Sequence, residues 1–409
     1  MEVNSLEILF FTRFGLRLKL HMNIKNLKKL VKVIISVIAR VMPLKKQIIF
    51  SNFYGKLPGD NPYYIWKWAE KHKIKSIWLV NDLEAARKKY GDYSFTEFVK
   101  YRGIRAFMAL STSQIWVDNV RKPWIPLKRT NQLYIQTWHG EPLKQIEKDA
   151  ISSLDNLYLQ WAKNDSQALD YVISGSDLSA NAFLNSFWLE SGKEKILQIG
   201  EPRWDLFNRT KVTDFSAINS ALGLRSDDKV ILYMPTFRDS KMDNEAIKLD
   251  FDKLISLFDS SYKLILRLHP NISPTFLNTD NPRIVNASQF GNPQDIIARS
   301  EVVITDYSSS MFDAMIANKK VILLAKDLDR YLNNNRKLYL EYRALPFPKF
   351  YSENEMQSFI VNQLNNEKNF DYSGFIRQHR FIQEYQATER IGQVILNRLN
   401  NTGKKTCIY

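Results

Sequence analysis

The sequence has few residues of the kinds that build disulfides or metal sites. Its single cysteine, Cys407, allows no intramolecular disulfide and no cysteine-based zinc cage. The five histidines show no close metal-ligand spacing among themselves. We therefore expect no structural metal and no resident cofactor, although a requirement for a divalent cation stays open. A single cysteine also fits a reducing cytosol.

Two glycine-rich phosphate-binding patterns are missing as well. The chain contains neither Gly-x-x-x-x-Gly-Lys-Ser/Thr nor Gly-x-Gly-x-x-Gly, so nucleotide binding through either pattern is a weak hypothesis. Apolar residues, in contrast, are plentiful: 44% of the 409 residues are hydrophobic and 25% are charged. This composition excludes a disordered or fibrous protein, and the length predicts two folded domains plus an appendage.

The N-terminal segment, residues 1–44, lacks an apolar run that could span a bilayer. Its longest uncharged stretch, residues 33–39, is far shorter than the roughly 18 residues that a membrane-spanning helix needs. A cleavable signal peptide is not expected either, because Glu2 and Glu7 precede the apolar stretch. Over residues 27–42, apolar side chains recur every three or four positions, which predicts an amphipathic helix.

Positive charge is concentrated in the same part of the chain. The formal net charge is +15, and residues 1–50 hold ten Lys or Arg against two Glu, a net +8. A basic amphipathic helix suits the headgroup region of an anionic membrane. The residues expected to contact it are Lys25, Lys28, Lys29, Lys32 and Arg40. The alternative is a helix docked on the protein's own core, and no nucleic-acid partner is expected because the body has no basic-aromatic recognition motif.

After Pro43, short β-rich runs alternate with helical patterns, as is typical of parallel sheets with crossover helices. The predicted strands are residues 47–53, 76–80, 114–119, 133–138, 171–174 and 196–199, then 230–234, 263–268, 283–286, 302–305 and 321–324. We therefore expect an α/β fold of two tandem doubly wound, Rossmann-like domains. Their predicted ranges are 45–210 and 229–370, with a linker at 211–228 and a C-terminal helix and tail at 371–409.

In such sheets, ligands bind beyond the carboxyl ends of the strands. One predicted strand is followed by His139 and Gly140, with Lys144 close behind. The glycine lets the backbone approach a ligand closely, and an imidazole with an ordinary pKa near 6.5 is a usable proton acceptor. The alternative is a capping or core histidine.

A second strand end carries Arg267 and His269, which alternate with leucines and should share one face of the strand. Two donors there suit a phosphate, although His269 could instead bond to a neighbouring carbonyl. A third strand end carries Arg238. Its guanidinium could bind phosphate oxygens, or it could form an ion pair with Asp239 or another carboxylate.

The fourth strand end reads Thr-Asp-Tyr-Ser-Ser-Ser and includes Asp306, Ser308 and Ser309. Hydroxyl side chains at the start of a helix can help to form an anion site, whereas the alternative is an ordinary N-cap serine. Asp313, one turn further on, could accept hydrogen bonds from a ribose or simply face solvent.

Taken in order, these segments resemble the motifs of the CDP-glycerol glycerophosphotransferase family, which are bacterial teichoic acid and capsule enzymes. The resemblance covers about residues 45–350. It rests on residues 137–144, 200–205, 232–239, 267–270, 305–309 with Asp313, and 327–331, together with Asp60-Asn61-Pro62.

The resemblance implies a GT-B arrangement, with the acceptor on the N-terminal domain and the CDP-alcohol donor on the C-terminal domain. His139 falls on the catalytic-base position, and His269 falls on a second catalytic, phosphate-facing position. The residues that match the donor-binding region are Arg238, Arg267, Asp306, Ser308, Ser309 and Asp313. Those on the acceptor side are Asp60, Asn61, Gly140 and Lys144.

Residues and resemblance together predict one reaction. A hydroxyl of a lipid-linked glycan or polyol-phosphate acceptor takes a polyol phosphate from CDP-glycerol, or alternatively CDP-ribitol, and CMP is released. The expected place is the cytoplasmic face of a bacterial membrane, in teichoic acid or capsule synthesis. A GT-B glycosyltransferase that uses a nucleotide sugar is the first alternative. A non-catalytic membrane-surface scaffold is the second.

Overall fold

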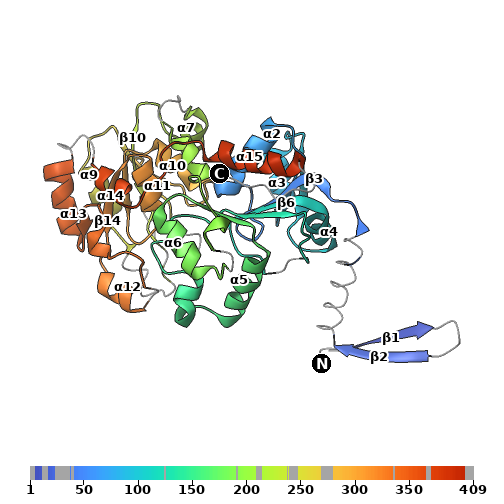
Figure 1. Cartoon of the computed structure of the whole chain (residues 1–409). Coiled ribbons are helices and arrows are strands. Elements are labelled where there is room, and N and C mark those ends of the chain that lie inside the picture. The colour runs from blue at the N-terminus through green and yellow to red at the C-terminus, as the bar shows by residue number, and fades with distance from the viewer. Residues whose placement is uncertain are drawn as a thin grey trace.

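The computed structural model describes residues 5–11, 17–23, 37, 41–123, 126–189, 192–208, 214–236, 238, 247–268, 280–334, 337–364 and 370–400. Most of the expected amphipathic helix, including Lys25, Lys28, Lys29, Lys32 and Arg40, lies outside these residues, as does His269. The described chain confirms the α/β prediction, because it forms two large parallel sheets with helices around them (Figure 1). Within the described part, no helix is long and apolar enough to cross a membrane.

The first sheet contains seven parallel strands in the order β5-β4-β3-β6-β7-β8-β9. In chain order, these strands are β3 (Lys45–Ser51), β4 (Ser76–Val80), β5 (Thr96–Lys100), β6 (Ser113–Asp118), β7 (Leu133–Gln136), β8 (Tyr171–Ser174) and β9 (Ile196–Gln198). Every residue of β4, β6 and β7 is buried, as expected for a parallel sheet that is covered on both faces. The helices α2 (Asp60–Lys71), α3 (Leu83–Tyr90), α4 (Ile104–Thr112), α5 (Asn156–Ala168) and α6 (Asp177–Ser186) connect its strands.

The second sheet contains six parallel strands in the order β12-β11-β10-β13-β14-β15. They are β10 (Lys229–Tyr233), β11 (Tyr262–Leu266), β12 (Ile284–Asn286), β13 (Val302–Thr305), β14 (Lys320–Leu324) and β15 (Lys349–Phe350). Its helices are α9 (Phe251–Ser256), α10 (Pro293–Arg299), α11 (Ser310–Ile316), α12 (Leu328–Asn334) and α13 (Glu353–Phe359). A short helix, α7 (Ser216–Leu222), lies between the two sheets in the chain.

The strand order reverses at the corresponding position in both sheets. In each, the first and fourth strands of the sheet are neighbours: β3 pairs with β6, and β10 pairs with β13. Such a switch point leaves a crevice beyond the carboxyl ends of the two strands, where doubly wound sheets bind ligands. The loops after β3, β6, β10 and β13 are therefore the first places to look for a site.

Most predicted strands are confirmed to within two residues at either end, but some elements were missed. Sequence patterns did not indicate β5, β15 or the antiparallel hairpin of β1 (Ser5–Phe11) and β2 (Arg17–Asn23). The prediction of one C-terminal helix within residues 371–409 was wrong. The chain forms α14 (Ser373–Gln378) and then α15 (Ala387–Asn400), because Arg380 and Tyr385 adopt left-handed backbone conformations between them.

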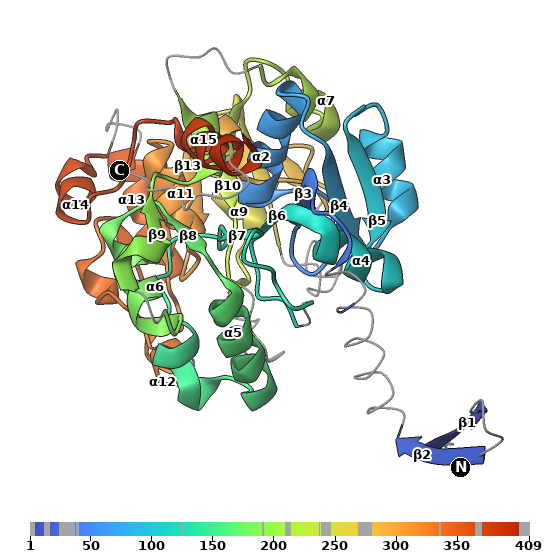
Figure 2. The ribbon, with the colours of Figure 1, turned by 45° about the vertical axis from the view of Figure 1, so that its right-hand side comes forward.

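Helix α15 returns to the N-terminal half and contacts α2 (Figures 1 and 2). Asp205 caps its start, accepting hydrogen bonds from the backbone N–H groups of Ala387 at 3.0 Å and Thr388 at 2.8 Å. Gly392 lies against Trp68 so closely that a Cβ there would be 2.3 Å from the indole ring. The C-terminal chain thus ties the two halves of the molecule together.

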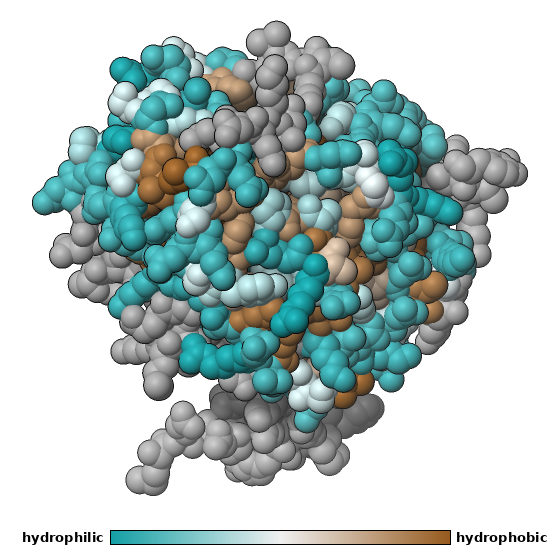
Figure 3. All heavy atoms as spheres, turned by 90° about the vertical axis from the view of Figure 1, so that its left-hand side faces the viewer, coloured by the Kyte–Doolittle hydropathy of each residue, from teal (hydrophilic) through white to brown (hydrophobic). Residues whose placement is uncertain are grey.

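The hydrophobic core also runs across the two halves. Leu143, Leu178, Trp204 and Phe207, all from the first half, belong to the same buried cluster as residues on one face of the second sheet. The molecule's outer face is different. On the side that is on the left in Figure 1, hydrophilic residues predominate and hydrophobic ones occur in small groups between them (Figure 3).

Candidate active site

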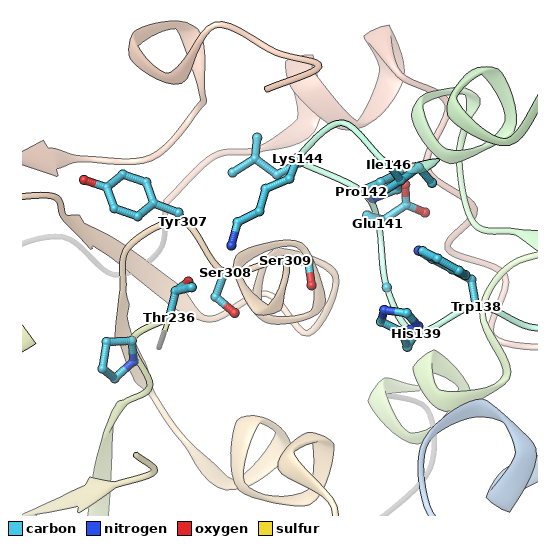
Figure 4. Close-up of a pocket in the computed structure, with 13 residues that line it drawn as sticks. Trp138, His139, Glu141, Pro142, Lys144, Ile146, Thr236, Tyr307, Ser308 and Ser309 are labelled. Atoms are coloured by element: carbon cyan, nitrogen blue, oxygen red, sulfur yellow. The ribbon is translucent and has the colours of Figure 1, made fainter. Parts of the chain in front are cut away.

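A cavity of about 350 Å³ lies between the two halves of the molecule. The loop after β7 forms one wall, and the loops after β10 and β13 form the other. Figure 4 shows this arrangement, with His139 on one side and Ser308 and Ser309 on the other. The lining residues are Trp138, His139, Gly140, Glu141, Pro142, Leu143, Lys144, Ile146, Pro235, Thr236, Tyr307, Ser308 and Ser309.

His139 is held in one orientation. Its Nδ1 lies 2.8 Å from the backbone carbonyl oxygen of Asn119. A carbonyl can only accept, so Nδ1 carries the proton and the lone pair is on Nε2. Burial lowers the pKa of His139, and the hydrogen bond to Asn119 offsets only part of this. The ring therefore stays neutral near pH 7, in the form that a general base requires.

The backbone around His139 is shaped for close contact with the other half of the molecule. Trp138 has a φ of 52°, an uncommon conformation for a non-glycine residue. Gly140 has a φ of 140°, and a Cβ there would lie 2.9 Å from Ser309 Oγ and 3.1 Å from Arg203 Nη2. Only glycine fits this position without displacing the loop after β13.

Ser308 and Ser309 carry the hydroxyl groups on the opposite wall. Ser308 Oγ lies 2.9 Å from Ser310 Oγ. Ser309 precedes α11 but makes no side-chain capping hydrogen bond, and its hydroxyl has no hydrogen-bond partner among the residues that the structure describes. The simple N-cap interpretation of Ser309 therefore has no support. Lys144 also lines the cavity, with Nζ 5.2 Å from the centre of the Tyr331 ring.

Arg238 does not line this cavity. Its guanidinium bonds to Asp306 at 2.8 Å and to Asp327 at 3.0 Å, and its carbon lies 4.9 Å from the ring centres of both Tyr307 and Tyr331. The side chain is only 4% exposed. The structure therefore favours the ion-pair alternative for Arg238, with Asp306 and Asp327 as its partners. Asp239 lies outside the described residues.

Asp306 stabilises the loop after β13 through hydrogen bonds to the backbone. It accepts hydrogen bonds from the backbone N–H groups of Thr236 at 2.8 Å and Tyr307 at 2.6 Å. It thus joins the loop after β10 to the loop after β13, and both of these loops line the cavity. Burial opposes ionisation of Asp327, but Arg238 and the Tyr307 hydroxyl outweigh it and lower the pKa of Asp327.

Arg267 also donates its hydrogen bonds to the protein itself. Its guanidinium reaches the backbone carbonyls of Ala287 at 3.2 Å, Phe290 at 2.6 Å and Gly291 at 3.0 Å. Burial lowers its pKa to about 10. The structure thus places Arg267 in the support of the β12–α10 loop and not on the cavity wall. His269 lies outside the described residues, so its predicted place beside a phosphate stays a prediction.

Asp60 and Asp313 lie in a buried ion-pair cluster around Arg203, not on the cavity wall. Arg203 Nη1 donates to Asp60 Oδ1 at 2.8 Å, and Nη2 donates to Asp313 Oδ1 at 2.9 Å. Asp313 also accepts from the indole of Trp204 at 2.7 Å and from Gln294 at 3.2 Å. This cluster joins the two halves of the molecule directly behind Gly140.

Asn61 and two glutamates complete the cluster. Asn61 Nδ2 donates to Glu201 Oε2 at 2.6 Å, and Asn61 Oδ1 accepts from the backbone N–H of Arg203 at 3.1 Å. Glu141 accepts from the hydroxyls of Ser176 at 2.6 Å and Ser179 at 3.0 Å. Burial raises the pKa of Glu141 to about 7 and that of Glu201 to about 8. With these pKa values, the cluster holds at least one proton near pH 7.

Sequence reasoning did not find all of these residues. Asn119 contacts His139 through its backbone carbonyl, a role that no side-chain pattern reveals. Arg203 and Glu201 fell inside a motif but had no role assigned. The signal that could have found them was position, because both residues follow the predicted strand 196–199 as the other site residues follow theirs.

Two Rossmann-like sheets with a cavity between their facing carboxyl edges form a GT-B-type architecture. The sequence identifies the family. The family model described as "CDP-Glycerol:Poly(glycerophosphate) glycerophosphotransferase" matches residues 34–397. The chain belongs to this family and is a polyol-phosphate transferase.

Named relatives agree with this assignment. A teichoic acid glycerol-phosphate transferase of Staphylococcus aureus (strain NCTC 8325 / PS 47) is 30% identical over 375 residues, which are 87% of this chain and 94% of the relative. A teichoic acid poly(glycerol phosphate) polymerase of Staphylococcus epidermidis is 33% identical over 319 residues, 74% of this chain but only 43% of the relative. A structure of the wall teichoic acid polymerase TagF superimposes with a TM-score of 0.80 at 28% identity, covering 93% of this chain and 97% of the chain in that structure.

Proposed function

We propose that this enzyme transfers glycerol phosphate from CDP-glycerol to a hydroxyl of a membrane-linked acceptor, in teichoic acid or capsular polymer synthesis. CDP-ribitol is the alternative donor. The observation that carries the proposal is the cavity between the two sheets, where His139 faces Ser308 and Ser309 across the domain boundary. One wall presents a base, and the other presents donors suited to an anion.

In the proposed reaction, the acceptor hydroxyl oxygen attacks the phosphorus that carries the glycerol. A new P–O bond forms, the bond from that phosphorus to the bridging oxygen of the diphosphate breaks, and CMP leaves with the electron pair. The acceptor proton passes to Nε2 of His139. Such a positioned base contributes about 10²- to 10⁴-fold to the rate.

Negative charge on the phosphoryl group must be stabilised by donors that are already in place. We assign this role to the hydroxyls of Ser308 and Ser309 and to Lys144, because all three line the cavity. His269 is proposed as a second catalytic group that faces the phosphate. All four other predicted donor residues belong to the proposed donor-binding domain. Arg238 and Asp306 hold loops that form the cavity, Arg267 supports the β12–α10 loop, and Asp313 pairs with Arg203.

The proposed domains follow the two sheets. Residues 45–210 would take the acceptor and residues 229–370 the donor, joined by the linker at 211–228. Gly140 lets the acceptor-side loop reach Ser309, while Asp60 and Asn61 hold that side against the donor domain through Arg203. Close packing of the two domains would exclude water, which otherwise competes as the acceptor.

Donor turnover tests the proposal. Purified full-length protein would be assayed with CDP-glycerol, CDP-ribitol and a UDP-sugar, each with a lipid-linked acceptor. We expect CMP release with a phosphodiester product from CDP-glycerol. UDP release from the UDP-sugar without CMP release would support the glycosyltransferase alternative. No turnover of any donor, by protein that binds membranes, would support the scaffold.

Membrane-surface association is the second part of the proposal. It rests on the basic segment of residues 1–44 and on a cavity of about 500 Å³ close to the place where that segment enters the first sheet. Ile74, Leu396 and Leu399 provide its apolar lining. Its four lysines have no ion-pair partner among the described residues: Lys45, Lys46, Lys73 and Lys75. Charge complementarity and continuity with the basic segment favour anionic lipid headgroups as the occupant.

A sedimentation experiment with vesicles tests this part. Deleting residues 1–42 should weaken binding to anionic vesicles and leave turnover of a soluble acceptor analogue intact. Adding Lys73→Glu and Lys75→Glu should remove the remaining binding. The matched control is Lys88→Glu with Lys163→Glu, on α3 and α5, because these exposed lysines do not line the cavity. Aggregation of the shortened protein would show instead that the apolar stripe covers the protein's own core.

A further inference from the structure

Asn119 lies directly after β6, at the switch point of the first sheet, and is completely buried. Its backbone carbonyl oxygen accepts the hydrogen bond from His139 Nδ1 at 2.8 Å. Its own backbone N–H donates to Asp118 Oδ1 at 2.8 Å. The peptide groups on both sides of Asn119 are thus fixed, and one of them determines which ring nitrogen of His139 carries the proton.

The side chain of Asn119 is also fully engaged. Its amide nitrogen donates to Asn52 Oδ1 and to Asp60 Oδ2, both at 2.8 Å, and its Oδ1 accepts from the backbone N–H of Phe53 at 3.0 Å. The two N–H groups of the Asn119 amide thus face two oxygen acceptors. The orientation of the Asn52 amide is fixed because its nitrogen donates to the backbone carbonyl of Leu57. An asparagine at this position satisfies all of these partners. An aspartate would instead put a carboxylate oxygen, which can only accept, against the oxygens of Asn52 and Asp60.

Asn119 also constrains the His139 imidazole indirectly, through Phe53. The Phe53 ring packs against His139 with 5.4 Å between ring centres, and its backbone is in the left-handed region with a φ of 39°. The hydrogen bond from Phe53 N–H to Asn119 Oδ1 stabilises this strained conformation. Trp138 packs near the imidazole as well, at 4.3 Å between ring centres.

Asn119 also connects His139 to the donor domain. Asp60, its hydrogen-bond partner, bonds to Arg203, which bonds in turn to Asp313 on α11. The backbone N–H of Asp60 donates to Asn292 Oδ1, at the start of α10, at 3.2 Å. A continuous series of buried polar contacts therefore runs from the imidazole to two helices of the other sheet.

We propose that Asn119 is a positioning residue for His139: it fixes the Nδ1–H tautomer and the ring orientation, and it links both to the packing of the donor domain through Asp60 and Arg203. The inference rests on the proposed role of His139 as the base. Asn119 does not line the cavity, so its effect on the reaction passes through His139.

Kinetics of Asn119→Ala test the inference. We expect kcat to fall by about 100-fold, the loss that roughly 1 Å of misplacement can cause, while KM for CDP-glycerol changes less than about twofold because the donor domain is intact. The matched control is Gln114→Ala, which removes an amide that donates to the backbone carbonyl of Arg398 at 2.9 Å near the opposite end of β6; its kcat should equal that of the wild type. Asn52→Ala, a milder change, should lower kcat less and serves if Asn119→Ala does not fold.

A spectroscopic measurement separates positioning from general structural support. In ¹⁵N NMR spectra of the full-length protein, His139 should show a protonated Nδ1 and an unprotonated Nε2, with its signals assigned by their loss in His139→Ala. In the folded Asn119 or Asn52 variant, the other tautomer should become populated. A folded variant with wild-type kcat, or one that loses kcat without any change in these signals, would overturn the inference. Full activity of His139→Ala would instead refute the proposed function, whatever the NMR signals show.

Discussion

Arg203 and Asp313 form a buried ion pair across the boundary between the two sheets, with 2.9 Å between Nη2 and Oδ1. The same guanidinium bonds to Asp60, in the first half of the molecule, at 2.8 Å. One side chain thus holds both halves of the molecule directly behind Gly140, whose loop carries His139. Removal of one partner from such a cluster leaves uncompensated charges in a dry environment.

Arg203→Ala should therefore reduce the free energy of unfolding by about 3–5 kcal/mol, as expected when one partner of a buried ion pair is lost. Urea or guanidinium titration at pH 7 measures this change. The control is Arg105→Ala, which breaks an ion pair with Glu97 in which the arginine side chain is 81% exposed; it should cost less than about 1 kcal/mol. Equal small losses in both variants would contradict the central role of Arg203.

Glu201 should make stability depend on pH in an unusual direction. Its pKa is raised from 4.5 to about 8, mainly by burial, so the folded state retains a proton that the unfolded state has released between these values. The contribution of this group to the free energy of unfolding therefore decreases as pH rises from about 4.5 to about 8 and is level above that.

Glu201→Gln removes this ionisation. The stability of the variant minus that of the wild type should therefore be larger at about pH 9 than at about pH 6. Thermal unfolding of both proteins at both pH values measures this difference. Glu141, whose pKa is raised to about 7, should contribute in the same direction. A difference between variant and wild type that is the same at both pH values would show that Glu201 is already ionised in the folded protein.

Ser308→Ala and Ser309→Ala should each weaken CDP-glycerol binding by about 1–2 kcal/mol, if each hydroxyl donates a hydrogen bond to the donor. Calorimetric titration measures the affinity. Ser256→Ala is the matched control, because this exposed hydroxyl in the same domain donates to the backbone carbonyl of Lys253. Unchanged affinity in both single variants would remove these serines from the donor site.

The pH profile should reveal the lowered pKa of His139. Burial favours the neutral imidazole, which is the active form of a base, so activity should be lost only as pH falls through a value below 6.5. The acid limb of kcat/KM for the acceptor measures that value in the free enzyme. An acid limb at or above about 6.5 would contradict either the environment of His139 or its role as the base.

Much of this fold could be predicted from the sequence because parallel strands that are buried on both faces read as short apolar runs. Strand β5 was missed because Thr96, Glu97 and Lys100 interrupt its pattern at the edge of the sheet. The break between α14 and α15 has no proline or glycine to mark it. It depends on a tertiary contact, the hydrogen bond from Ile382 N–H to the carbonyl of Gly175.

The site was predicted less completely for a similar reason. His139, Gly140, Lys144, Ser308 and Ser309 were found because they follow strands, and all five line the cavity. Sequence position could not show which charged residues bond to ligand and which bond to protein. Arg238 and Asp313 are chemically suited to a nucleotide, yet the folded chain places carboxylates, arginine and indole groups around them.

The central claim is that His139 acts on the acceptor while the donor binds the other domain. Comparison of wild type with His139→Ala, in CMP release from CDP-glycerol with an acceptor and in calorimetric binding of CDP-glycerol, tests it most directly. The account predicts that the variant loses transfer and binds the donor with an affinity close to that of the wild type. A variant that still transfers, or one that loses donor binding together with transfer, would contradict it.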